Sequence, residues 1–322
     1  MRHQKRRAAE TEGAADSETH LSFAGHETFV FRYAWLTKAV EAVQTDPEIF
    51  SREDAIVRLG VGKNMVRSIR HWGLATGVLQ EEPKSRGSVL SVSELGQFLL
   101  GEHGLDRYLE DQATLWLFHW QLVSNRTRST TWRWAFSALP SNEFTRAALQ
   151  DALIDAAKRA GDKSPSESSV RRDVEVFVRT YVASRVSSGA VPEESLDCPL
   201  VELELLEEAN GLVRFVRGPK DTLSDEVFAF AVTDFWQSTA SNRETLSFSD
   251  LSYGMGAPGS AFKLDENSLV ERLERLERVT DGALVYADTA GLKQLYRHAA
   301  RTPLSYLQKL RRPSAMPALV GV

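Results

Sequence analysis

The stretch LGVGKNMVRSIRHW, residues 59–72, predicts a tight turn followed by a helix with one apolar and one basic side. Met65, Ile69 and Trp72 recur at helical spacing, so we expect them to share one buried face. The basic side chains of this segment are then expected mostly on the opposite side: Lys63, Arg67, Arg70 and His71. Asn64 lies at the helix start. Such a helix is either an ordinary solvated surface helix or the second helix of a DNA-reading helix-turn-helix.

The flanking sequence favours the second alternative. Residues 52–59 are expected to form a preceding helix, and two glycines separate it from the helix that follows. Downstream, GVLQ and VLSV predict the two strands of a hairpin, and its polar tip carries Lys84 and Arg86. This is the order of a winged helix-turn-helix. Its lysines and arginines would bind phosphates, while Asn64 and one arginine could reach base edges.

The whole chain has the composition of a globular protein, with 42% hydrophobic and 26% charged residues in 322. Its net charge is -5, but residues 51–87 carry a local +3 and residues 125–185 a local +4, against -8 over residues 193–244. Separate basic segments allow a DNA-binding face on an acidic protein. The alternative is chance clustering of charge.

Cellular location follows from what the sequence lacks. Cys198 is the single cysteine, which excludes a disulfide framework and a CxxC metal site. No apolar run approaches the roughly 20 residues that span a bilayer, and the N-terminus has no apolar secretory region. We therefore expect a cytoplasmic protein without a membrane partner.

The pattern of elements predicts a mainly α-helical protein of the α+β class, with small β-hairpins. Winged helix-turn-helix modules are expected to flank a helical middle. The expected division is a disordered arm over residues 1–20, an N-terminal winged helix-turn-helix over 21–105, a helical middle region over 106–190 and a C-terminal winged-helix-like domain over 191–322.

The middle region contains three informative segments. DQATLWLFHWQLV, residues 111–123, is apolar nearly all round and predicts a buried helix. NRTRSTTWRWAF mixes arginines with Trp132 and Trp134, which fits either unstacked bases or core tryptophans. A helix from Ser166 to Tyr181 belongs either to another helix-turn-helix or to a helical hairpin. Two basic residues beside its apolar face, near the N-terminal end, are candidates for a second DNA contact: Arg171 and Arg172.

GHETF, residues 25–29, is the best candidate for a reactive site. His26 could act as general base or metal ligand, and Glu27 could hold a divalent ion such as Mg²⁺ or Mn²⁺. Phosphodiester cleavage needs these functions to activate water and stabilise charge. The alternative is that His26 or Thr28 caps a helix. The metal ligands stay unassigned, because no HNH-type or HExxH pattern is present.

Several blocks together resemble one bacterial family, the domain of unknown function 4007: GHETF, LGVGKNMVRSIRHW, TLWLFHWQL, SSVRRDVEVFVRTYV, LDCPLVELELL and PGSAFKLDENSLVERLE. The likeness covers nearly everything after residue 20. Members of this family are linked to DNA phosphorothioation and phage-defence gene clusters. The resemblance does not assign a catalytic residue to any position of this sequence.

The resemblance implies a DNA-binding nickase of an anti-phage modification system. It would open one strand of double-stranded DNA so that sulfur can replace a non-bridging phosphate oxygen. Its expected partners are a cysteine desulfurase, an ATPase and a PAPS-reductase-like enzyme, and a homodimer is left open. The alternatives are a non-catalytic DNA-binding adaptor or transcription regulator that positions partner enzymes, and a protein-interaction scaffold without DNA contact.

Overall fold

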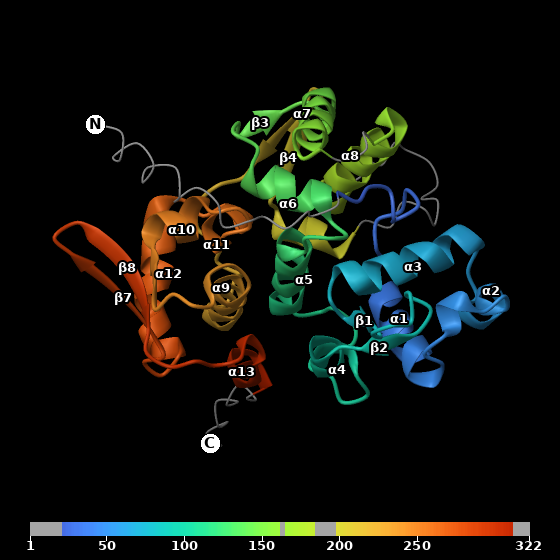
Figure 1. Cartoon of the computed structure of the whole chain (residues 1–322), viewed down its shortest axis with the longest axis horizontal. Coiled ribbons are helices and arrows are strands. Elements are labelled where there is room, and N and C mark those ends of the chain that lie inside the picture. The colour runs from blue at the N-terminus through green and yellow to red at the C-terminus, as the bar shows by residue number, and fades with distance from the viewer. Residues whose placement is uncertain (1–20, 162–164, 184–197, 312–322) are drawn as a thin grey trace, which may run out of the picture.

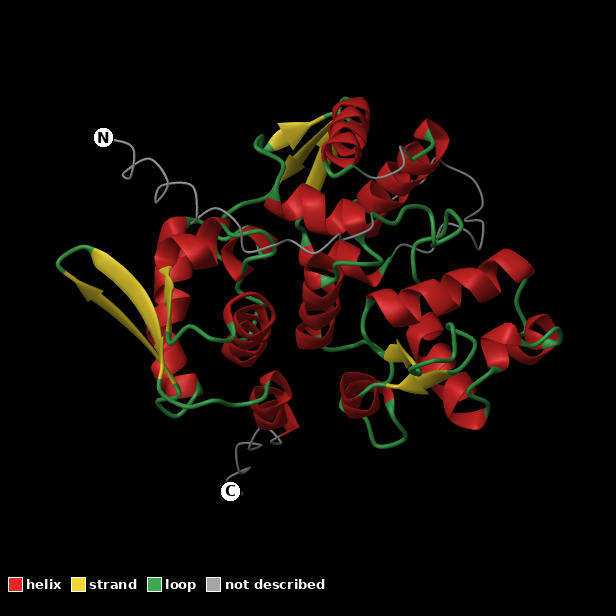
Figure 2. Cartoon of the chain, viewed as in Figure 1, coloured by secondary structure: helices red, strands yellow, loops and turns green. Residues whose placement is uncertain are grey.

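The computed structural model describes residues 21–161, 165–183 and 198–311 (Figure 1). Helices dominate, and the strands form three small antiparallel sheets (Figure 2). The expected α+β class is therefore confirmed. The expected disordered arm over residues 1–20 lies outside the described residues.

The N-terminal unit is a set of helices followed by a hairpin. Its elements are α1 (Tyr33–Thr45), η1 (Ile49–Ser51), α2 (Ala55–Leu59), α3 (Lys63–Ala75), β1 (Leu79–Glu81), β2 (Leu90–Val92) and α4 (Glu94–Leu100). Gly60 ends α2 with a φ of 64°, a left-handed conformation that glycine adopts at little cost. The turn, the second helix and the hairpin lie where the sequence predicted them. Assignment of this unit as a winged helix-turn-helix stays a prediction.

The middle region combines helices with a short three-stranded sheet. Its elements are α5 (Gln112–Ser124), α6 (Thr130–Ser137), β3 (Glu143–Phe144), α7 (Arg146–Arg159), α8 (Glu167–Tyr181), η3 (Pro199–Leu203), β4 (Leu206–Ala209) and β5 (Leu212–Phe215). The strand order is β3-β5-β4, and α7 and α8 pack against each other. The sheet joins strands from both sides of the boundary expected at residue 190, so the segment up to β5 packs with the middle region.

The C-terminal unit again contains a hairpin after its helices, and this hairpin extends from the body at the left of Figure 1. Its elements are α9 (Asp225–Ala240), β6 (Thr245–Ser247), α10 (Phe248–Tyr253), α11 (Pro258–Ala261), α12 (Glu266–Val279), β7 (Leu284–Thr289), β8 (Leu292–Arg297), α13 (Pro303–Leu307) and η4 (Gln308–Arg311). The sheet order is β6-β8-β7. Its winged-helix character likewise stays a prediction.

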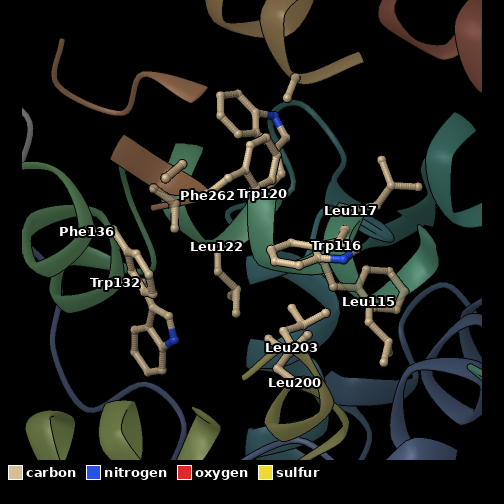
Figure 3. Packing of buried hydrophobic residues seen from close by; sticks show 14 of the residues in the cluster. Leu115, Trp116, Leu117, Trp120, Leu122, Trp132, Phe136, Leu200, Leu203 and Phe262 are labelled. Carbon is tan, nitrogen blue, oxygen red and sulfur yellow. The ribbon is translucent and has the colours of Figure 1, made fainter. Parts of the chain in front are cut away.

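A continuous hydrophobic core runs through all three units, with α5 at its centre. As its sequence predicted, α5 is buried on every side, and Trp116 and Trp120 pack with Phe262 of the C-terminal unit (Figure 3). Trp132 of α6 is 1% exposed, so it is a core residue rather than a platform for bases. No helix in the described ranges is long and apolar enough to cross a membrane.

Candidate DNA-binding and cleavage site

His26 lies in a buried turn and has both ring nitrogens engaged. Its Nε2 is 2.7 Å from Oδ1 of Asp173 on α8. The backbone N–H of Thr28 donates to its Nδ1 over 3.2 Å. Because Nδ1 accepts a hydrogen bond, the ring proton lies on Nε2 and is donated to the carboxylate. This geometry leaves His26 without a free nitrogen for a substrate proton or a metal ion.

Asp173 is the centre of a buried hydrogen-bond network. Besides His26, it accepts from the backbone N–H of Ala24 at 2.7 Å and from the hydroxyl of Thr131 at 2.5 Å. Burial opposes ionisation of Asp173, but the hydrogen bonds from His26, Thr131 and Ala24 outweigh it and hold its pKa below the ordinary value. Hydrogen bonds to this carboxylate therefore connect the N-terminal turn with α6 and α8 of the middle region.

The turn at residues 24–29 is held in an unusual backbone conformation. Glu27 and Thr28 have φ values of 52° and 75°, which side-chain-bearing residues rarely adopt, β-branched threonine least of all. Gly25 is required by space, since a Cβ there would lie 2.5 Å from Nδ1 of His71. The His26 ring stacks on Trp72 with the ring centres 6.0 Å apart. Packing and the Asp173 network thus offset the backbone strain.

Glu27 is the member of the expected catalytic pair that retains access to solvent. Its side chain is 33% exposed, and its Oε1 lies 3.3 Å from Nη1 of Arg67 on α3. The alternative that His26 or Thr28 caps a helix is wrong, because α1 begins only at Tyr33 and has no side-chain cap. The structure therefore separates the two residues: His26 is buried and hydrogen-bonded, whereas Glu27 is part of the charged surface.

The basic side of α3 is confirmed in part. Lys63, Asn64 and Arg67 are exposed, and the Arg70 side chain is 27% exposed. His71 departs from the prediction, because it is only 8% exposed under the turn that carries Gly25. Burial lowers the pKa of His71 to about 3, so its ring is neutral near pH 7. It therefore carries no charge for a phosphate.

The remaining expected DNA contacts are all at the surface. Lys84 and Arg86 are exposed at the tip of the β1–β2 hairpin, both with positive φ values. Arg171 and Arg172 are exposed in the first half of α8. None of these residues lies in the Asp173 network. Their role as DNA contacts stays a prediction.

Sequence reasoning missed the partner of His26, although a signal was present. Asp173 falls between Val170 and Phe177 on the apolar stripe of α8, and a carboxylate on a buried face needs hydrogen-bond partners. Arg179 was also missed, and Arg128 was considered only within the segment NRTRSTTWRWAF, without its contact to Glu81. They come from other parts of the chain, and periodicity within one segment gives no sign of such contacts.

The described residues contain no group of three or more His, Cys, Asp or Glu side chains that could hold a metal ion. His26 does not fit a metal, because both its nitrogens already have partners. Mg²⁺ commonly takes only one or two protein carboxylates together with water and phosphate oxygens. Glu27 is therefore the residue of the turn that fits such a role.

Comparison with known proteins shows the family to which the chain belongs. A search of curated proteins finds no match. Two solved structures are similar. A magnesium-ion-bound SspB crystal structure shares 32% identity and a TM-score of 0.81, covering 92% of this chain and 90% of its own. Another SspB crystal structure shares 31% identity and a TM-score of 0.79, covering 92% and 91%. The family model for the protein of unknown function DUF4007 matches residues 23–310, so the chain belongs to the DUF4007 family.

Proposed function

We propose that this protein binds double-stranded DNA and cuts one strand in an Ssp-type phosphorothioation system. The observation that supports this most is the likeness to SspB, which extends over more than nine tenths of the chain. A cysteine desulfurase, an ATPase and a PAPS-reductase-like enzyme are its proposed partners. In such a system, one strand must be opened before sulfur can be inserted.

DNA would be bound through a winged helix-turn-helix in the N-terminal unit. The order of helices and hairpin supports this, as does the exposure of basic side chains on α3 and at the hairpin tip. Lys63 and Arg67 would contact phosphates, while Asn64 at the start of α3 would reach base edges. Arg171 and Arg172 of α8 are a second proposed contact.

For the cleavage step we assign different tasks to the two residues of the turn. Glu27 is the proposed site residue, and Mg²⁺ or Mn²⁺ held there would supply charge stabilisation for the departing oxygen. His26 is a positioning residue, because its nitrogens are occupied by Asp173 and Thr28. It fixes the backbone of residues 24–29 and thereby the direction of the Glu27 side chain.

The engaged nitrogens of His26 also favour a second function, a non-catalytic adaptor or transcription regulator that positions partner enzymes on DNA. Both functions neutralise phosphates, so both lose DNA affinity as salt rises. A protein-interaction scaffold without DNA contact makes a different prediction. Replacing Arg67 and Arg70 by glutamate would then leave DNA association unchanged, whereas either DNA-binding function predicts a severe loss.

The decisive experiment is conversion of supercoiled plasmid to open circles by the purified protein, with Mg²⁺, with Mn²⁺ and with EDTA. The nickase predicts open circles only with metal, strongly reduced by Glu27→Gln and unaffected by Glu244→Gln, an exposed residue of the C-terminal unit. DNA binding without nicking under any metal, also with the partner proteins present, would establish the adaptor instead.

A further inference from the structure

One group of charged side chains joins α3 to the middle region. Oε1 of Glu81 accepts from Nη2 of Arg70 at 2.9 Å and from Nη2 of Arg128 at 2.7 Å. Arg70 belongs to α3, whereas Arg128 lies on the loop between α5 and α6. The three side chains are each about one third exposed, at 27% for Arg70, 30% for Arg128 and 36% for Glu81. Two guanidinium groups thus meet a single carboxylate oxygen at the surface.

A second group of two arginines lies at the turn, but there the two arginines have different acceptors. Arg67 of α3 pairs with Glu27, and Nη1 of Arg179 on α8 donates to the carbonyl oxygen of Thr28 over 3.5 Å. Each α3 arginine is therefore accompanied by an arginine from the middle region. In both groups two arginines accompany one carboxylate, but only Glu81 accepts from both of its arginines.

This arrangement suits the phosphates of DNA. A carboxylate oxygen between two guanidinium groups has the charge and the accepting geometry of a phosphate oxygen. Ion pairs at such exposed positions are weak, so a polyanion that also releases counterions can replace the carboxylate. Asp173 holds the turn against α8, and the His26 ring of the turn stacks on Trp72 of α3, so the arginines of α3 and α8 need little reordering when DNA binds.

We propose that Arg128 and Arg179 contact DNA phosphates beside Arg70 and Arg67, so that the duplex lies across both α3 and the middle region. Glu81 keeps the first pair of arginines together in the free protein and gives way to a phosphate in the complex. This inference rests on the DNA binding proposed above. It adds two contact residues outside the helix-turn-helix and a carboxylate that competes with DNA.

The test is the affinity for a short fluorescent DNA duplex, measured by anisotropy in EDTA over a series of salt concentrations. Arg128→Gln and Arg179→Gln should each weaken binding and reduce the slope of log K against log salt by about 0.9, the loss of one phosphate contact. Glu81→Gln should strengthen binding about two- to fivefold, because the competing carboxylate is gone. Arg128→Lys should retain most of the slope, since it keeps the charge.

The matched control is Arg243→Gln in the C-terminal unit, where an arginine of 53% exposure pairs with Asp250 at 2.8 Å. This variant loses the same charge and should bind as the wild type does. The melting temperature of each variant should remain within about 3 °C of the wild type, because the pairs are exposed.

Two results would overturn the inference. One is that Arg128→Gln and Arg179→Gln have the same DNA affinity and salt slope as Arg243→Gln, although Arg67→Gln weakens binding. The protein would then bind DNA without contacts from Arg128 and Arg179. The other is that Glu81→Gln weakens binding, which would contradict competition by the carboxylate. If the wild-type protein shows no salt-dependent affinity at all, the proposed function itself fails.

Discussion

Replacing His26 by alanine is expected to lower the free energy of unfolding by about 3 kcal/mol. Loss of the hydrogen bond to the charged Asp173 accounts for about 1.5–3 kcal/mol, because the buried carboxylate loses one of its donors. Loss of the ring contact with Trp72 adds about 0.5–1.5 kcal/mol. Asp173→Ala should be more severe, at about 3–5 kcal/mol, since it orphans several buried donors.

The assay is urea unfolding followed by tryptophan fluorescence, which is sensitive to the turn because Trp72 and Trp132 adjoin the His26 ring. The double variant lacking both His26 and Asp173 should be at least about 1.5 kcal/mol more stable than additivity predicts, because each single change removes the same interaction. His298→Ala, at an exposed position, is the control and should stay within about 0.5 kcal/mol.

The positioning role of His26 would be refuted by a stability measurement. Suppose His26→Ala unfolds within about 0.5 kcal/mol of the wild type, as a surface change would. The residue would then not position the turn. If that stable variant had also lost metal-dependent nicking, His26 would be a catalytic residue after all. An additive double variant would show that the contact between His26 and Asp173 contributes little.

Two further predictions concern stability. Burial lowers the pKa of both His71 and His119 to about 3, so unfolding takes up protons below pH 6.5, and the stability present above that pH is lost as the pH falls toward 3. Between pH 6 and 5 the free energy of unfolding should drop by about 1.2 kcal/mol per histidine, and His119→Gln should halve the pH slope in urea titrations; an unchanged slope would contradict the burial argument. Gly25→Ala should cost about 1–3 kcal/mol in thermal unfolding, because its Cβ would meet Nδ1 of His71 at 2.5 Å. A Cβ at Gly62 would have no atom within 4 Å, so Gly62→Ala should destabilise the protein less than Gly25→Ala does. Equal losses of stability in the two variants would disprove the steric argument.

Local periodicity was sufficient wherever a single helix or hairpin decides the outcome. The all-round apolar sequence of α5 corresponds to a helix buried as expected, and on the expected face of α3 Ile69 and Trp72 are buried while Met65 is partly buried. The glycine turn before α3 and the hairpin after it also follow from local preferences. In each case, residues close in sequence set the backbone and the buried face together.

Periodicity failed at His71, which the sequence placed among the exposed basic residues. The α3 helix is covered on two sides, by α1 and by the turn around Gly25, so its buried arc is wider than one apolar stripe indicates. The turn belongs to the segment before α1, and its path across α3 depends on the Asp173 network rather than on any preference of residues 59–72.

The family resemblance, the α+β class, the buried α5 and the basic character of α3 could all be predicted from the amino-acid sequence. Tertiary structure decided what the site residues do. His26 and Asp173 are 147 residues apart, and their contact turns a candidate base into a buried donor whose acceptor is the Asp173 carboxylate. Arg128 and Arg179 likewise come from distant segments, and they contact Glu81 and the carbonyl oxygen of Thr28, next to the α3 arginines. The reason is physical: a side chain's partners, charge and exposure depend on which distant segments the hydrophobic core brings together.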